Sequence, residues 1–103
     1  MIEIKAYIRN VMVDDVIDAL SKLEAVTGIA VVTLKEYGHA AKNGSLQRVE
    51  MTKLEVDVAD DAEQQVVDCI VQYARTRKGH PGDGRVFVTQ LKQAVRIADG
   101  VRE

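Results

Sequence analysis

The 103-residue sequence contains one cysteine, one proline, one phenylalanine and no tryptophan, and it has no long run of apolar residues. Its single cysteine, Cys69, excludes an intrachain disulfide and suits a reducing compartment. The first residues alternate between apolar and polar types, so neither a signal peptide nor a membrane span is expected there. We therefore expect a soluble, cytoplasmic protein that does not insert into a membrane.

A surplus of positive charge is also missing, since 14 Lys and Arg stand against 16 Asp and Glu and give a net charge of −2. General nucleic-acid binding needs a basic face, so the sequence excludes that class of partner. The length is typical of one domain, which we expect to span residues 1–103. A chain of this size buries only a modest core, which makes a further interface between subunits plausible.

Residues 75–85 are the most informative segment, with three of the seven glycines, the only proline and four of the 14 basic residues. Glycine lets backbone N–H groups approach a ligand closely, and successive N–H groups in a turn form an anion site. Nearby cations add charge complementarity, so the pattern favours a phosphate group, such as that of a nucleotide. An ordinary basic loop between a helix and a strand fits the same residues. Composition alone leaves both interpretations open.

Hydrophobic periodicity predicts six elements in the order β-α-β-β-α-β. Apolar and polar residues alternate in the first strand, and apolar residues recur at three- and four-residue steps in both helices. The strands are expected at residues 2–8, 29–34, 51–58 and 86–89, and the helices at residues 13–23 and 60–74. This order is that of a ferredoxin-like α+β fold, in which two helices cover one face of a four-stranded antiparallel sheet.

Other segments follow the periodicity less closely. Residues 38–50 are polar and contain an Asn-Gly turn sequence, so a loop is expected there. The step from Met51 to Leu54 interrupts the alternation of the third strand. Asp60 and the glutamate three residues later have the spacing of a capping box at the start of the second helix. A helix is one option for residues 91–97.

Several short segments, taken in chain order, resemble segments of one known protein family. Thr27-Gly28 followed by residues 31–38, and then Gly82-Asp83-Gly84-Arg85 followed by residues 94–97, are short and individually unspecific. Together with residues 4–20, their order and spacing resemble the PII signal-transduction family over nearly the whole chain. In that resemblance the glycine segment corresponds to the family's B-loop, and residues 94–97 correspond to its C-loop.

The resemblance implies a homotrimer that binds ATP, ADP or AMP in three clefts between subunits. The backbone N–H groups of Gly82, Asp83 and Gly84 are implied donors to the phosphates, and Arg85 replaces the usual lysine as the cationic contact. The other implied nucleotide contacts are Gly38 at the adenine or ribose, Thr76 in positioning the B-loop, and Arg96 from the neighbouring subunit.

The resemblance also implies that residues 38–50 form a shortened T-loop that engages a target protein, with a membrane transporter or an efflux system as candidates. The implied partner contacts are His39, Lys42, Asn43, Gly44, Ser45 and Arg48. The tyrosine that enterobacterial relatives uridylylate is missing, and Met51 stands where a lysine contacts 2-oxoglutarate. Whether 2-oxoglutarate or bicarbonate is a co-effector therefore stays open, and no cofactor is implied.

No nucleophile beside a histidine, no bracketing pair of carboxylates and no Walker motif occurs, so we do not expect an enzyme and assign no catalytic residue. Two alternatives to the regulatory module remain. A metal-tolerance protein on the same trimeric fold would use His39, His80 and Cys69, although these do not form the usual cluster of ligands and no metal site is expected. A small nucleotide-hydrolysing enzyme would depend on Arg85.

Overall fold

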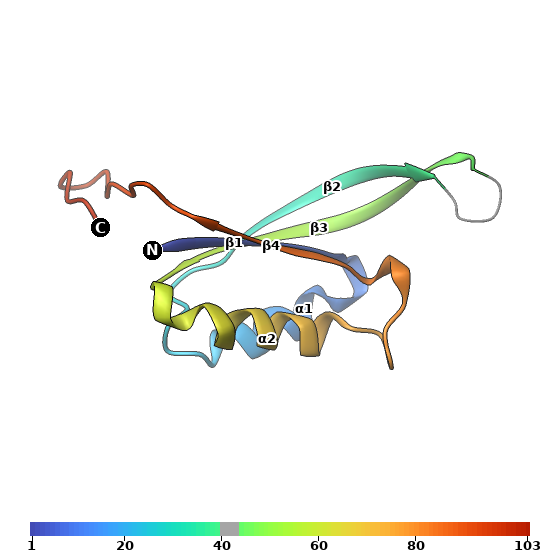
Figure 1. Ribbon diagram of the computed structural model, residues 1–103, viewed down its shortest axis with the longest axis horizontal. Coiled ribbons are helices and arrows are strands. Elements are labelled where there is room, and N and C mark those ends of the chain that lie inside the picture. The colour runs from blue at the N-terminus through green and yellow to red at the C-terminus, as the bar shows by residue number, and fades with distance from the viewer. Residues whose placement is uncertain (40–43) are drawn as a thin grey trace.

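A computed structural model describes residues 1–39 and 44–103 and contains four strands and two α-helices in the described chain (Figure 1). A short 3₁₀ turn precedes each helix and the last strand. The elements are β1 (Ile2–Arg9), α1 (Val13–Ser21), β2 (Ala30–His39), β3 (Leu46–Val58), α2 (Glu63–Ala74) and β4 (Gly84–Gln90), with 3₁₀ turns at Asn10–Met12, Asp60–Ala62 and Pro81–Asp83. No helix in the described ranges is long and apolar enough to cross a membrane.

The strands form one antiparallel sheet in the order β2-β3-β1-β4, with β1 and β3 in the centre. Both helices lie on the same side of this sheet (Figure 1). Sheet order and helix placement confirm the predicted ferredoxin-like α+β fold. The edge strands β2 and β4 have no further strand beside them in the described chain, and one face of the sheet has no helix over it.

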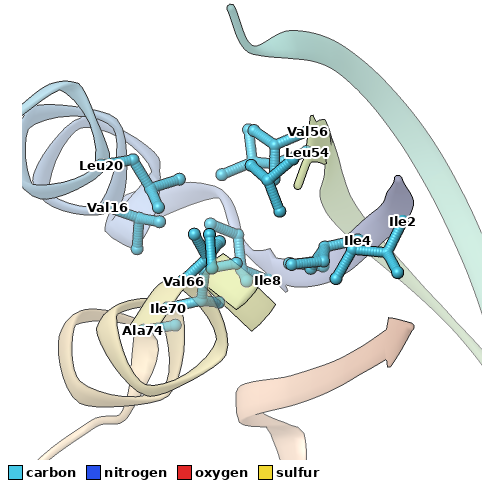
Figure 2. Packing of buried hydrophobic residues seen from close by; sticks show 13 residues of the cluster. Ile2, Ile4, Ile8, Val16, Leu20, Leu54, Val56, Val66, Ile70 and Ala74 are labelled. Carbon is cyan, nitrogen blue, oxygen red and sulfur yellow. The ribbon is translucent and has the colours of Figure 1, made fainter. Parts of the chain in front are cut away.

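The core lies between the helices and the sheet, because both elements present an apolar side to the same space. In β1 every second residue is buried, and the apolar stripes of α1 and α2 point toward these side chains (Figure 2). Removing one such side chain from water stabilises the fold by about 1.5–3 kcal/mol. The largest fully buried side chains are Ile4, Ile8, Leu20, Leu54, Ile70, Val16, Val58 and Val66.

The interruption between Met51 and Leu54 has a simple cause. Thr52 pairs with Ile8 of β1 and therefore occupies the helix-facing position that the pattern left empty. Its hydroxyl is buried and donates a hydrogen bond of 2.7 Å to the side-chain oxygen of Asn10. The strand thus alternates regularly, with a satisfied polar residue in one core position, and Met51 faces the other side of the sheet.

The hairpin of β2 and β3 is longer than the sequence predicted. Backbone pairing continues through Gly38 opposite Gln47 and His39 opposite Leu46, so Gly38, His39 and Arg48 lie in strands and the predicted loop bounds 38–50 are wrong. The two strands extend beyond the helices as a ribbon that is exposed to water on both faces (Figure 1). Because neither face is buried there, the sequence does not show the alternation of apolar and polar residues that marks a strand. Gly44 and Ser45 precede β3, whereas Lys42 and Asn43 lie outside the described residues.

Two other local predictions are wrong. Residues 91–97 are not helical; the end of the chain forms a turn closed by the bridge between Val95 and Arg102, on an arm that leaves the sheet (Figure 1). Asp60 makes no capping hydrogen bond, because its carboxylate lies 2.7 Å from the N-terminal amine of Met1. The spacing of Asp60 and Glu63 matched a capping box by coincidence.

Candidate functional site

The loop between α2 and β4 is organised around the carboxylate of Asp83. This group accepts hydrogen bonds from the backbone N–H of Thr76 at 3.0 Å, the hydroxyl of Thr76 at 2.6 Å and the backbone N–H of His80 at 2.9 Å. The Nε of Arg9, from the far end of β1, donates a fourth bond at 3.0 Å. One side chain therefore joins the end of α2, the middle of the loop and the central sheet.

These donors hold the pKa of Asp83 well below its usual range, with the hydroxyl of Thr76 as the largest cause and the backbone N–H groups of Thr76 and His80 next. Donors stabilise the charged form of a carboxylate and leave the neutral form unsatisfied. Asp83 is thus ionised at neutral pH. Its own backbone N–H donates to the carbonyl oxygen of His80 at 3.0 Å, so this amide is already engaged within the loop.

The imidazole of His80 completes the loop. Its Nδ1 lies 2.7 Å from the hydroxyl oxygen and 3.1 Å from the carbonyl oxygen of Thr76. The hydroxyl of Thr76 donates to Asp83, and a carbonyl oxygen only accepts, so Nδ1 of His80 is the atom that carries a proton. His80 and Asp83 therefore both contact Thr76 and together hold it in place.

Two glycines lie against the end of β1; Gly84 is required there by a backbone contact and by its φ, whereas the flexible side chain near Gly82 can move. A Cβ on Gly84 would lie 1.7 Å from the carbonyl oxygen of Tyr7, and its φ of 113° is one that L side chains rarely adopt. A Cβ on Gly82 would lie 2.8 Å from a terminal nitrogen of Arg9. The loop therefore rests directly on the end of β1, with the guanidinium of Arg9 against its backbone.

A cleft of about 550 Å³ opens beside this loop. Gly82, Gly84 and Arg85 line it from the loop and β4, and Gly38 lines it from β2. Four of the seven predicted nucleotide contacts thus surround one space, although 44 residues separate Gly38 from Gly82. Thr76 and Asp83 do not line this cleft; they form the hydrogen-bond network that shapes the loop beside it.

The guanidinium of Arg85 is positioned by an aromatic pair. It lies 5.4 Å from the centre of the Phe87 ring, and Phe87 in turn packs edge-on against Tyr7 with ring centres 5.7 Å apart. Its side chain is 68% exposed, so it is accessible to an anion. The carboxylate of Glu36 lies 3.8 Å away. Such a cation over a ring and beside a cleft suits a phosphate oxygen as partner.

Arg96 lies apart from the other predicted contacts within this chain. The arm that carries it leaves the sheet at the end opposite the glycine loop (Figure 1). There Arg96 donates to both carboxylate oxygens of Asp99 at 2.8–3.1 Å, and Glu103 lies 3.6 Å away. Within one chain it does not reach the cleft, and its predicted role depends on a neighbouring subunit.

Arg9 and Glu36 were missed by the sequence analysis. Arg9 meets Asp83 across 74 residues of sequence, and no local pattern indicates such a contact. Glu36 was not singled out because it falls between the predicted strand 29–34 and the predicted loop 38–50. Its place two residues before Gly38 is the one indication that the sequence offered.

A second cavity of about 690 Å³ lies on the helix side of β4. Its walls combine apolar side chains of β1, α2 and β4 with residues of the glycine loop and its flanks, namely Arg75, Gly79, His80, Pro81, Asp83, Gly84 and Arg85. Gly84 and Arg85 line both spaces, but the cleft also holds Gly38 and Gly82, so we take the cleft as the candidate phosphate site. The described residues contain no group of three or more His, Cys, Asp or Glu placed to hold a metal ion. Burial raises the pKa of the Cys69 thiol, which makes it a weak nucleophile.

Comparison with known proteins gives consistent matches over almost the whole chain. A family model described as nitrogen regulatory protein P-II matches residues 1–101. A nitrogen regulatory protein P-II of Cereibacter sphaeroides is 33% identical over 108 residues, which cover 97% of this chain and 94% of the relative. Proteins of that name from Bradyrhizobium diazoefficiens, at 31%, and Escherichia coli K12, P-II 1 at 32%, share the same coverage.

Proposed function

The chain belongs to the nitrogen regulatory protein P-II family, and from this membership we propose that it is a cytoplasmic regulatory protein that binds an adenine nucleotide and controls a partner protein. ATP, ADP and AMP are the candidate ligands, and three copies of the single domain 1–103 form the clefts. The match in residues 1–101 confirms the resemblance inferred from the sequence. The protein acts by binding, without catalysis.

One observation carries the proposal: Gly38, Gly82, Gly84 and Arg85 surround a single cleft. Glycine at positions 82 and 84 lets a phosphate approach the backbone, and Arg85 supplies a preorganised cation. Thr76 acts indirectly, because its hydrogen bonds to Asp83 fix the loop. The predicted donation from the Asp83 amide requires the loop to release its hydrogen bond to the carbonyl oxygen of His80.

The arm with Arg96 supports a site shared between subunits. Ile97 is fully exposed and Val95 and Val101 are nearly half exposed, so the arm presents apolar side chains that are not part of the buried core. Docking on a neighbouring copy would bury these side chains and bring Arg96 to that copy's phosphates. Because Arg96 is already paired with Asp99, it would arrive oriented.

The output is carried by the β2–β3 hairpin. Gly38 lies both in the wall of the cleft and in β2, so a ligand there contacts the strand that leads to His39, Lys42, Asn43, Gly44, Ser45 and Arg48. A ligand changes the hairpin only if it binds two hairpin states with different affinity. A membrane transporter or an efflux system is the candidate target.

Calorimetric titration with ATP, ADP, AMP and cyclic AMP, with and without 2-oxoglutarate or bicarbonate, tests the proposal. We expect binding by at least one adenine nucleotide, about tenfold weaker in Arg85→Gln because a charge-assisted contact is lost. Lys22→Gln removes an exposed charge at the C-cap of α1 and should bind as the native chain does. Absence of binding at millimolar concentration would refute nucleotide sensing.

Two further measurements test the remaining parts. Light scattering after gel filtration should give the mass of a trimer, and a monomer would remove the shared cleft. Product formation from ATP that disappears in Arg85→Gln would replace the binding module by the hydrolase alternative.

A further inference from the structure

The charges lining the cleft nearly cancel. Among the described residues in its wall, Glu36 and Arg85 are the charged ones, one of each sign. The neighbouring guanidinium of Arg9 is likewise matched, because its Nε donates to the ionised Asp83. A site that attracts a polyphosphate usually carries an excess of cations. The described part of this cleft that one chain supplies does not, and the Arg96 proposed to reach it from a neighbouring copy is itself paired with Asp99.

Glu36 faces the cleft for a structural reason. In the β2–β3 ladder Leu34 pairs with Met51, and Glu36, two residues further along β2, pairs with Val49. Because side chains alternate between the two faces of a sheet, the side chain of Glu36 is on the same face as that of Met51. Its carboxylate reaches Arg85 on the other edge strand at 3.8 Å. The side chain is one-third exposed, which keeps its charge close to any ligand in the cleft.

The ion pair itself is weak, because the side chain of Arg85 is two-thirds exposed and the separation is long. A phosphate can therefore displace the carboxylate from Arg85. The charge of Glu36 nevertheless stays in the cleft wall, where it repels each negative charge that the ligand brings. The repulsion from Glu36 and the attraction to Arg85 both grow with the charge of the ligand, so the carboxylate cancels much of the attraction that each added phosphate charge would otherwise gain from Arg85.

We propose that Glu36 is a specificity-determining residue that lowers the affinity of the cleft for highly charged phosphates relative to singly phosphorylated ones. This inference rests on the proposed nucleotide site. It states that the carboxylate of Glu36 shifts the preference of that site toward AMP and away from ATP. The ligand contacts Arg85 and the glycine backbone, and Glu36 sets the charge that the cleft accepts.

The test is calorimetric titration of Glu36→Gln with AMP, ADP and ATP. Glutamine keeps the shape and removes the charge. We expect affinity to rise for all three ligands in the order ATP, ADP, AMP, with the ratio of ATP to AMP affinity increasing about five- to tenfold. Glu36→Asp keeps the charge and shortens the side chain, so its ligand preference should stay close to that of the native chain.

Glu50→Gln is the matched control, because Glu50 is exposed on the same hairpin but pairs with Lys35, one position away from Glu36, and so lies on the opposite face. It should leave the ATP to AMP ratio unchanged. Equal shifts in Glu36→Gln and Glu50→Gln, or no shift in either, would overturn the inference while leaving the proposed function intact. If no variant binds any nucleotide, both fall; binding gained only by Glu36→Gln would support the charge argument.

Discussion

The glycine loop before β4 and the arm after it are both polar segments in which an arginine pairs with an aspartate. They differ in the sequence separation between the arginine and the aspartate. Asp83 is held by Arg9 across 74 residues, together with Thr76 and His80. Asp99 is held by Arg96, three residues earlier, and by the N–H of Val101. The loop is therefore held by local hydrogen bonds and also tied to the folded sheet, whereas the arm is held by its own sequence.

This contrast suits two different tasks. A loop anchored to the sheet keeps its backbone in one conformation, which would suit the phosphate site proposed above. An arm that is ordered locally but has few contacts with its own core can pack against another molecule without disturbing the sheet. The hydrogen bond from the Leu91 amide to the carbonyl of Met1 marks where the sheet ends and the arm begins.

The largest effect is expected for Gly84→Ala, which places a Cβ against the carbonyl oxygen of Tyr7 at a φ of 113°. The start of β4 must move or the backbone must stay strained, at a cost of about 2–4 kcal/mol in the free energy of unfolding. Urea denaturation measures it. Gly28→Ala is the control, since a Cβ there meets nothing within 4 Å. Equal stability of the two variants would mean that the loop does not rest on β1.

A smaller loss of stability is expected for Asp83→Asn, because an amide cannot accept all four hydrogen bonds. The pKa of Asp83 is lowered in the folded chain, so its contribution is present above the unfolded value of about 3.9 and is lost as the pH falls below it. The midpoint difference from the native chain should therefore be full at pH 7 and shrink below about pH 4. Thermal unfolding between pH 3 and pH 7 tests this, with Glu24→Gln as a control; a difference independent of pH would contradict it.

The smallest effect is expected for Asp99→Asn. Arg96 lowers the pKa of Asp99, but the pair is exposed and local, so the midpoint of unfolding should not change measurably. Hydrogen exchange should instead become faster at the amide of Val101, because its acceptor changes from a charged carboxylate oxygen to a weaker, neutral amide oxygen. If Asp99→Asn destabilises the chain as much as Asp83→Asn does, the stability of the fold depends on the arm, and the arm is not ordered by local contacts alone.

The fold was predictable where a residue's surroundings follow from its neighbours in sequence. The alternation in β1 and the apolar stripes of α1 and α2 each mark one buried side, and their order fixed the ferredoxin-like arrangement. The same reasoning failed for the ends of the β2–β3 hairpin, which water reaches on both faces, and for residues 91–97, where Arg96 and Asp99 close a turn instead of continuing a helix.

The glycines and basic residues of the loop, and their chemistry, were evident from the amino-acid order alone, because turn conformation and charge are properties of short segments. Tertiary structure decided which of them meet. It brought Gly38 beside Gly82, set Arg9 on Asp83 and placed Glu36 opposite Arg85. These contacts join residues far apart in sequence, and the twist and register of the packed sheet, which no local pattern encodes, determine their geometry.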